Sequence, residues 1–445
     1  MKKYLLLLFL LFAVNINAQF DNMLEEGAML DGGLGISFID GDPYYTFRFR
    51  PEIAIGNFGA GLDLNLEFNS SGKLRTENFL TTSDYLSIIR YLRWGHKHDP
   101  FYIRVGALDY ATLGYGNIMY LYNNSPSYDT RTIGIVVDLD MDTWGVETNY
   151  SNFAEAGVLG LRGYVRPLKF TTLGKIPVIG GLTVGLSYVT DINQYAGYVD
   201  GYYVDSTQTF VATDDRGSIQ IGSADIGLPI FQTSVTSLDL YYTYTKIMDF
   251  GSGSAVGALF NFDFTGVNLR VKLERTWNGR RYIPAYFDAL YEIDRFRYDE
   301  QDQVVNSKVR MLDNATLDDA NGWYGGLMLD VMSLFRVQGS YQRLDKRPNT
   351  GRLHLAGEVD PMGMPFVVRG GYDKTNIASE AEIFTLDERS LLYAEVGYKP
   401  WPFMIVSLVY KWTFTPIRGA DNVILGYDRQ EKIEPRVSFE MPLQF

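Results

Sequence analysis

The chain of 445 residues contains no cysteine and only three histidines. Without thiols, disulfide bonds, thiol catalysis and a cysteine-linked lipid anchor are all excluded. Histidine is the usual general base of enzymes, yet no serine or carboxylate is placed by the sequence as a catalytic set with His96, His98 or His354. We therefore expect no enzyme activity. His96 and His98 favour a solvated turn over a metal site, and we expect no metal ion and no cofactor.

The chain is also poor in basic charge and in long apolar runs. It has 40 Lys and Arg against 53 Asp and Glu, a formal net charge of −13, which argues against nucleic acid as a partner. The apolar run from Tyr4 to Val14 is too short for a transmembrane helix, which needs ~20 residues, and no other stretch comes near that length. Because it follows basic residues and precedes the small residue Ala18, residues 1–18 are predicted to be a secretory signal peptide cleaved near Ala18.

What the sequence has instead is strict alternation of apolar and polar residues. In the last ten residues the apolar positions are Val437, Phe439, Met441, Leu443 and Phe445. Successive side chains of a strand point to opposite faces, so one face is apolar and the other is polar. The pattern recurs along the chain, for example over 62–68 and 267–274. Charges on successive polar positions cannot face a protein core without a steep desolvation cost, so this face lies in water.

The alternation predicts an all-β fold of twenty strands: 30–39, 44–55, 58–68, 85–94, 101–108, 131–139, 143–152, 157–167, 182–190, 217–226, 235–246, 255–263, 266–276, 323–332, 334–343, 352–359, 365–373, 389–399, 403–413 and 434–445. Connections on one side of such a sheet are mostly short. On the other side they are long: 109–130, 191–216, 277–322, 374–388 and 414–433. A soluble β-sandwich, the alternative, gives no reason for this sorting.

The final strand, with Ser438 and the apolar positions Phe439, Met441, Leu443 and Phe445, resembles the C-terminal assembly signal of bacterial outer-membrane β-barrel proteins. Glu440 stands where that signal usually has glycine. The resemblance implies one transmembrane antiparallel barrel of about 20 strands (range ~16–22) over residues 30–445, with short periplasmic turns and long external loops. It also implies a short periplasmic segment at 19–29, location in the bacterial outer membrane, and outer-membrane lipids and the barrel-assembly machinery as partners. Homo-oligomerisation is left open.

A barrel of this size is wide enough to hold water unless something fills it. Its polar face carries charges of both signs, and the residues predicted to line the lumen are Arg48, Arg50, Asp63, Glu67, Arg104, Arg270, Lys272, Glu274 and Arg336. The longest connection, 277–322, is the first candidate for an inward-folded loop that narrows the lumen, with Arg280, Arg281 and Arg295 as candidate constriction residues. The alternatives are an external loop or a further strand pair, which would raise the strand number to about 22.

The segment from Ile103 to Val137 resembles substrate-selective porins. The resemblance rests on Arg104–Val105–Gly106, then Leu113–Gly114–Tyr115–Gly116–Asn117, then Asp129–Thr130–Arg131. These motifs follow the order of strand, glycine turn, and loop returning to a strand. The sequence thus favours a porin-like channel for passive passage of polar or charged small solutes. The alternative is a barrel occluded by its own loops that serves as a structural or secretion and surface-assembly accessory protein.

Overall fold

The computed structural model describes residues 27–443 except 78, 81, 98, 128–130, 177, 205, 208, 300–303, 314–317, 333, 360–364 and 419–423. The predicted signal peptide 1–18, most of the segment 19–29, His98 and Phe445 lie outside the described residues. Among the residues that are described, no helix is long and apolar enough to cross a membrane.

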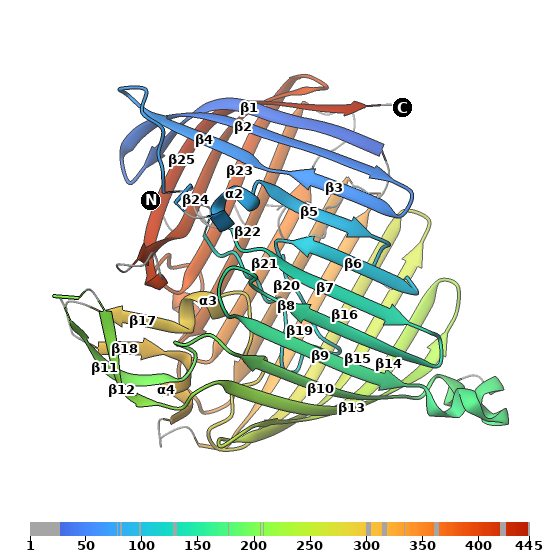
Figure 1. Ribbon diagram of the computed structural model, residues 1–445. Helices are drawn as coiled ribbons and strands as arrows, with labels where there is room; N and C mark the ends of the chain where they lie inside the picture. Colours follow the sequence, from blue (N-terminus) through green and yellow to red (C-terminus); the bar gives the residue numbers. More distant parts are fainter. Residues whose placement is uncertain are drawn as a thin grey trace.

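The described residues form a closed antiparallel barrel of twenty strands (Figure 1). Its first half comprises β1 (Gly27–Ile39), β2 (Asp42–Ile55), β3 (Phe58–Leu62), β4 (Leu64–Asn69), β5 (Ile89–Trp94), β6 (Phe101–Gly106), β7 (Gly134–Asp140), β8 (Trp144–Tyr150), β9 (Val158–Val165), β10 (Thr183–Asp191) and β13 (Ile219–Gln232). The second half comprises β14 (Thr236–Ile247), β15 (Ser252–Phe264), β16 (Val267–Asn278), β19 (Ala320–Val331), β20 (Phe335–Leu344), β21 (Gly351–Val359), β22 (Phe366–Ile377), β23 (Ser390–Trp401), β24 (Met404–Arg418) and β25 (Ile424–Leu443). Because β3 and β4 both pair with β2 and are separated only at Asp63, they count as one strand.

The barrel closes where its last strand pairs with its first. β25 runs antiparallel to β1 from Ala28 opposite Leu443 to Ile39 opposite Lys432. Every strand predicted from the alternation overlaps an observed strand, and the predicted strand number is confirmed. Only one predicted loop is wrong in kind. Most of 414–433 continues as the β24–β25 pair, because the ladder persists to Arg418 opposite Ile424.

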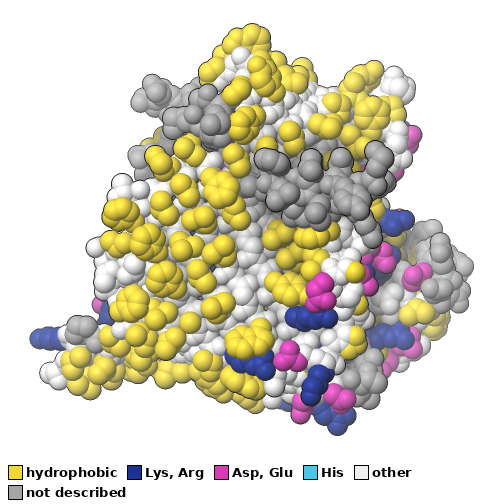
Figure 2. All heavy atoms as spheres, turned by 180° about the vertical axis from the view of Figure 1, so that it is seen from behind, with side chains coloured by type: hydrophobic (Ala, Val, Ile, Leu, Met, Phe, Trp, Pro, Cys, Tyr) yellow, Lys and Arg dark blue, Asp and Glu magenta, His cyan; other side chains and the backbone are white. Residues whose placement is uncertain are grey.

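The two faces of the barrel wall differ as the alternation predicts. On β25, Ile433, Phe439 and Met441 are 36–39% exposed on the outside, whereas Lys432 and Glu434 are 2% and 4% exposed on the inside. Figure 2 shows apolar side chains spread over the outer surface, with charged side chains gathered toward one end. An apolar outer band around a polar interior is the arrangement of transmembrane barrels.

The two ends of the barrel also differ. The end that carries the shorter connections, at the right in Figure 1, is called the turn end; the opposite end is called the loop end. The longest connection of the turn end holds three 3₁₀ turns, η1 (Pro167–Phe170), η2 (Thr172–Lys175) and η3 (Ile179–Gly181). The loop end carries 70–88, 107–133, 192–218, 279–319 and 378–389. The sorting of loop lengths by side is therefore observed.

Short elements within the loops stand outside the barrel sheet. They are α2 (Thr82–Leu86), β11 (Tyr198–Val204), β12 (Thr209–Asp215), α3 (Tyr291–Asp294), β17 (Phe296–Asp299), β18 (Val304–Ser307), α4 (Lys308–Asp313) and η4 (Glu380–Glu382). β11–β12 and β17–β18 form two separate hairpins at the loop end (Figure 1). The segment 285–298 thus adds no strand to the barrel, because β17 pairs with β18 alone.

Candidate functional site: an inward loop and a charged lumen

Residues 107–133, here called the inward loop, leave the wall at the end of β6 and enter the lumen. Gly106 makes the turn with φ +140°, and a Cβ there would lie 2.3 Å from the Arg90 carbonyl oxygen. The loop is a hairpin in which Ala111 and Tyr122 exchange backbone hydrogen bonds of 2.7 and 2.9 Å. The Asn124 side chain closes its base, because its Oδ1 accepts from the Leu108 N–H at 2.9 Å and its Nδ2 donates to the Ser151 carbonyl at 2.8 Å.

The tip of the inward loop is fastened to the far wall. The Asn117 amide donates to the Ser223 and Thr245 hydroxyls of β13 and β14. Lys272 of β16, eight strands further round the wall from β6, donates to the Tyr115 carbonyl. Ten strands would be directly opposite in a barrel of twenty. The loop therefore crosses most of the lumen.

Two glycines fit the tip against the wall. Gly114 has φ +56°, and its N–H donates to Glu147 Oε2 of β8 at 2.8 Å. A Cβ at Gly114 would lie 2.7 Å from Arg162 Nε, and Gly116 has φ +83°. Left-handed backbone of this kind is readily available only to glycine. The glycine turn noted in the sequence is thus what brings the tip close to the wall.

Tyrosines surround the lysine that holds the tip. The Tyr115 ring stacks on Tyr241 at 4.1 Å between centroids, and the Tyr120 hydroxyl bonds that of Tyr324. Lys272 Nζ lies 4.6 Å from the Tyr120 ring centroid and 4.9 Å from that of Tyr324. Cation–π contacts that are shielded from water add to the hydrogen bond from Lys272. Lys272 and Glu147 are therefore two charged wall residues that bond the tip, and Lys272 alone adds cation–π contacts with Tyr120 and Tyr324.

Residues 279–319, here called the cap loop, cover the inward loop from the loop end. The backbones pair, with Ala285 N–H donating to the Asn117 carbonyl at 3.0 Å and Phe287 N–H to the Ile118 carbonyl at 3.1 Å. The side chain of Phe287 is completely buried in a cluster that also holds apolar residues of both loops and of the wall. This hydrophobic cluster fills part of the lumen at the loop end.

The candidate constriction arginines of the cap loop lie in different places. Arg280 is 65% exposed beside Asp318, and Arg281 bonds Asp313 at 2.6 Å near the surface. Arg295 alone reaches the barrel wall, where its Nε lies 2.7 Å from Asp191 Oδ2 at the end of β10. The three arginines do not converge, and the segment that crosses the lumen is the inward loop.

Buried charges also hold the cap loop itself together. Lys308 Nζ lies 2.9 Å from Asp288 Oδ2 and 3.8 Å from Asp294 Oδ2. Burial raises the pKa of Asp294 to about 6, the neighbouring Asp288 adds to this rise, and Lys308 opposes it. Burial also raises the pKa of Glu292, which accepts a hydrogen bond from the Tyr122 hydroxyl of the inward loop. The cap loop is therefore sensitive to mildly acidic pH.

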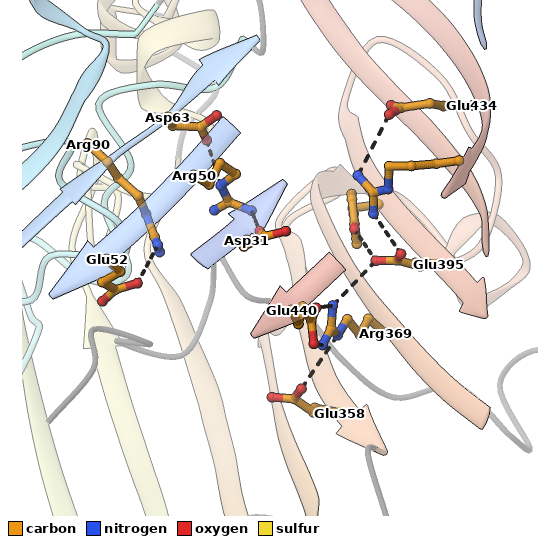
Figure 3. Close-up of polar contacts among 12 residues, drawn as sticks. Asp31, Arg50, Glu52, Asp63, Arg90, Glu358, Arg369, Glu395, Glu434 and Glu440 are labelled. Carbon is orange, nitrogen blue, oxygen red and sulfur yellow. Dashed lines mark hydrogen bonds and ion pairs between the residues drawn. The ribbon is translucent and has the colours of Figure 1, made fainter. Parts of the chain in front are cut away.

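A ladder of paired charges lines the wall formed by β1 to β4 and β21 to β25. In Figure 3, Arg369 lies between Glu358 and Glu440, with Nη1 2.8 Å from Glu440 Oε1 and Nε 3.6 Å from Glu358 Oε1. Arg436 Nη2 donates to Glu395 Oε1 at 2.6 Å. Glu440, unusual for the assembly signal, is thus an inward-facing partner of Arg369.

Three of the predicted lumen residues meet at this ladder. Asp63 is buried and accepts from Arg50 Nε at 3.0 Å and from Arg131 of the inward loop at 2.6 Å. Arg48 lines the same cavity, and no hydrogen bond or ion pair within 4.0 Å joins it to any described residue. This charged cavity, of about 140 Å³, is lined by eight basic and six acidic side chains.

The remaining predicted residues are dispersed. Glu67 pairs with Arg75 at 3.0 Å and Lys432 at 3.4 Å, and Arg104 pairs with Asp109 at 3.0 Å. Arg270 donates to Asn261 Oδ1 at 3.0 Å, and Glu274 accepts from the Tyr241 hydroxyl at 2.7 Å. Arg336 lies 3.0 Å from Asp330 on the neighbouring strand. All five face away from the apolar outer band, but they form no single cluster.

The inward loop lies at the boundary of three cavities. The turn-side cavity, about 450 Å³, shares Asp109 and Tyr110 with the charged cavity. It shares Tyr120, Leu121 and Lys272 with a third one of about 70 Å³, here called the tyrosine cavity. A solute that moves along the lumen between these spaces must pass the inward loop.

Of the wall partners of the tip, the sequence predicted only Lys272 as a lumen residue; it singled out neither Ser223 and Thr245 nor the inward-facing Arg369, Lys411 and Arg436. Arg436 sits on a polar position of the well-alternating last strand, so the alternation is a signal that could have found it; the strands of Arg369 and Lys411 also carry apolar inward residues such as Val367 and Val409, and their signal is weaker. No sequence signal pairs Asn117 with Ser223 and Thr245. Among the described residues, no group of three His, Asp or Glu side chains could hold a metal ion.

A closed antiparallel barrel with an apolar outside, a charged inside and long loops at one end is the architecture of bacterial outer-membrane β-barrels, as the sequence predicts.

No protein-family profile matches the chain, and no curated protein does. Solved structures similar to it include OccK11 (OpdR) of Pseudomonas aeruginosa, at 12% identity over 95% of this chain and 99% of that one (TM-score 0.33). OpdK, an outer membrane protein of the same species, is 11% identical over 95% and 100% (TM-score 0.31). OmpT, an outer membrane protein of Vibrio cholerae in its trimer form, is 10% identical over 93% and 98% (TM-score 0.30). Because one fold hosts many functions, likeness at this level assigns no solute or activity.

Proposed function

We propose that this chain is a porin-like channel that lets small polar or charged solutes pass the bacterial outer membrane. The observation that carries the proposal is the inward loop. It crosses a charged lumen and leaves cavities on both of its sides that share lining residues. Passive selection of this kind needs a narrow segment with placed charges, and both are present.

In this proposal the outward apolar side chains contact outer-membrane lipids, and the loop end faces the outside of the cell. Residues 1–18 serve export and are removed near Ala18. The assembly machinery reads the final strand, in which Phe439 and Met441 point outward. We propose no catalytic role for the chain.

The charged cavity favours anions over cations. The whole chain has a formal net charge of −13, and eight basic side chains face six acidic ones around this cavity. Glu52 and Glu67, just outside the cavity lining, pair with Arg90 and Lys432 and balance this excess. Arg48 carries most of the argument, because every acidic partner of the ladder is paired with another basic residue and Arg48 is not. Asp63 and Asp31 act on Arg48 only at longer range, and a low-dielectric wall strengthens the field that this unpaired guanidinium exerts in the lumen.

Ion conductance of the purified protein in a planar lipid bilayer tests the proposal. We expect stepwise currents, and in a KCl gradient a reversal potential that shows preference for chloride. Arg48→Gln removes a positive charge that forms no ion pair within 4.0 Å, so no carboxylate loses its partner, and it should move the reversal potential toward cations. Arg280→Gln removes a positive charge that is 65% exposed at the loop end and is the matched control. Silent bilayers with folded protein would reject the channel.

A second candidate function rests on the hydrophobic cluster of the cap loop and inward loop, in which Tyr286, Phe287 and Tyr291 are all buried. A filled lumen suits an occluded barrel that anchors secretion or surface-assembly partners. That function predicts proteins that co-purify with the barrel and are lost when the β17–β18 hairpin is removed. It also predicts no current before or after this removal.

A further inference from the structure

One connection at the turn end presents large apolar side chains to its surroundings. It consists of residues 166–176 and 178–182, here called the turn-end projection, and Figure 1 shows it standing out beyond the ends of β9 and β10. Its most exposed apolar side chains are Phe170 at 66%, Leu173 at 46%, Ile179 at 44% and Ile176 at 42%. Among its described residues only Gly180, which has no side chain, is buried. Exposed apolar patches of this kind mark surfaces that contact a partner or a membrane.

The turn-end projection is nevertheless an ordered unit. The Gly180 N–H donates to the Ile176 carbonyl at 2.9 Å. A Cβ at Gly180 would lie 2.3 Å from the Gly174 carbonyl oxygen, so the 3₁₀ turns pack backbone against backbone. At its base, Arg166 donates to both carboxylate oxygens of Asp140 at 2.8 and 2.9 Å. The apolar side chains are thus held outward by a hydrogen-bonded backbone that is fixed to the wall.

The charge of the turn-end projection is opposite to that of the chain. Residues 166–182 contain three basic residues, Arg166, Lys169 and Lys175, and no acidic one, in a chain with 53 acidic and 40 basic residues. Arg166 and Lys169 pair with aspartates at the β7–β8 turn, whereas Lys175 is exposed and pairs with no described residue. Segments that combine exposed apolar side chains with basic ones bind the surface of membranes that contain anionic lipid.

The turn-end projection leaves the wall where the apolar outer band ends. Val165, the last residue of β9, lies opposite Trp144, which is 44% exposed on the outside. Tryptophan at this position is typical of the membrane interface of a barrel. Outward side chains of β9 and β10 are apolar up to this level, as in Leu161 and Leu186, which are 49% and 67% exposed. In Figure 2 the apolar side chains of the projection, at the lower left, adjoin those of the outer wall.

We propose that the turn-end projection is an interfacial anchor that binds anionic phospholipid at the periplasmic surface of the outer membrane. Phe170, Leu173 and Ile176 insert among the acyl chains, and Lys175 lies among the lipid phosphates. Continuity with the apolar outer band and the local excess of basic charge favour a phospholipid surface over a protein partner. The inference rests on the proposed location and orientation of the barrel, and it does not depend on which solute passes or whether any does.

Fluorescence quenching by brominated lipids tests the anchor. Phe170→Cys in the otherwise cysteine-free full-length chain is labelled with a nitrobenzoxadiazole dye and reconstituted into vesicles of phosphatidylcholine and phosphatidylglycerol. We expect the dye to lose most of its emission when the acyl chains carry bromine, because bromine quenches only at close approach. Ser234→Cys, labelled in the same way, is the matched control. Ser234 is exposed in the β13–β14 turn at the same end, and a dye there should keep its emission.

The charge of the site is tested with bromine on only one of the two lipids, at equal mole fractions. Brominated phosphatidylglycerol should quench the dye at position 170 more strongly than brominated phosphatidylcholine. Lys175→Gln should lower this preference about fivefold, the worth of one basic residue near an anionic surface. Lys97→Gln removes an exposed positive charge from another turn of the same end and should leave the preference unchanged.

Two results would overturn the anchor. Equal quenching of the dyes at positions 170 and 234 would exclude the lipid contact and leave the turn-end projection as a surface for a protein partner. Equal quenching by the two lipids would exclude the preference for anionic headgroups. Currents from the same protein in a planar bilayer separate this inference from the proposed function. Stepwise currents with an unquenched dye reject only the anchor, and a quenched dye with silent bilayers rejects only the channel.

Discussion

Lys272→Met should release the tip of the inward loop. Lys272 donates to the Tyr115 carbonyl, and its Nζ lies 4.6 and 4.9 Å from the ring centroids of Tyr120 and Tyr324. Methionine keeps the length of the side chain but removes the charge. Glu274 keeps a partner, since the Tyr241 hydroxyl still donates to it at 2.7 Å. The change therefore acts mainly on the contact between wall and loop.

The size of the effect follows from these contacts. A hydrogen bond from a charged donor contributes about 1.5–3 kcal/mol, and each cation–π contact contributes about 0.5–1 kcal/mol when the value for exposed sites is taken as the lower bound. Allowing for non-additivity, we expect the free energy of attachment between tip and wall to fall by about 2–4 kcal/mol. Because 1.4 kcal/mol is a factor of ten, the population with a displaced tip should rise about 30- to 1,000-fold.

Single-channel recording in a planar bilayer measures this population, since a displaced tip widens the lumen and gives events of larger conductance. Arg270→Met is the control, because it removes the same charge two residues away on the same face. Arg270 bonds Asn261 on the neighbouring strand rather than the loop. We expect frequent large events for Lys272→Met and few for Arg270→Met. Identical traces of the two variants would refute the role of Lys272 as the fastener.

Three further predictions concern stability and the loops. Arg436→Met removes the closest basic partner of the fully buried Glu395, and we expect the barrel to lose about 3 kcal/mol of stability. Heat-modifiability gels should show a lower unfolding temperature. An unchanged temperature would contradict a stabilising role of the charge ladder. Asp294 has a pKa of about 6 in the folded cap loop, above its ordinary 3.8. The folded loop therefore binds more protons, and its stability rises as pH falls from 7.5 to 5. Hydrogen exchange of α3, corrected for intrinsic rates, should be slower at pH 5; faster exchange would reverse the assigned sign. Gly114→Ala places a Cβ in left-handed backbone against Arg162. The strain should weaken the attachment of the tip to the wall by about 1–3 kcal/mol. Labelling of a cysteine introduced at Leu121, whose side chain forms none of the hydrogen bonds that fasten the tip, should then speed up in the otherwise cysteine-free chain. Equal labelling rates with and without Gly114→Ala would show that the tip tolerates the Cβ.

Much of the fold follows from period-two alternation, because one face of each strand meets apolar surroundings and the other meets water. On the last strand this pattern placed Phe439 and Met441 outside and Glu440 inside, and the structure agrees. The alternation predicted the wrong boundary where the residue pattern itself stops. The strand pair β24–β25 continues past the predicted boundary because paired backbones extend the sheet even where the residue pattern weakens.

The path of the loops was much less predictable. Its length favoured 277–322 as the segment that narrows the lumen. In the structure the inward loop, 107–133, crosses the lumen, and the cap loop covers the inward loop. The tip is placed by contacts such as that of Asn117 with Thr245, 128 residues away in the chain. Such contacts depend on which strands face one another across the lumen, and no local pattern records that. Gly114 and Gly116 signalled a tight turn but not its position.

Removal of the tip of the inward loop tests whether this loop narrows and selects in the lumen. Ala111 and Tyr122 already pair across the hairpin, so residues 112–121 can be replaced by a two-glycine link without straining the base. Conductance of this variant and of the unaltered chain is compared in the same bilayers. We expect small stepwise currents with chloride preference for the unaltered chain and several-fold larger, weakly selective currents for the variant. Equal conductance of the two, or silence from both while the barrel is folded, would contradict it.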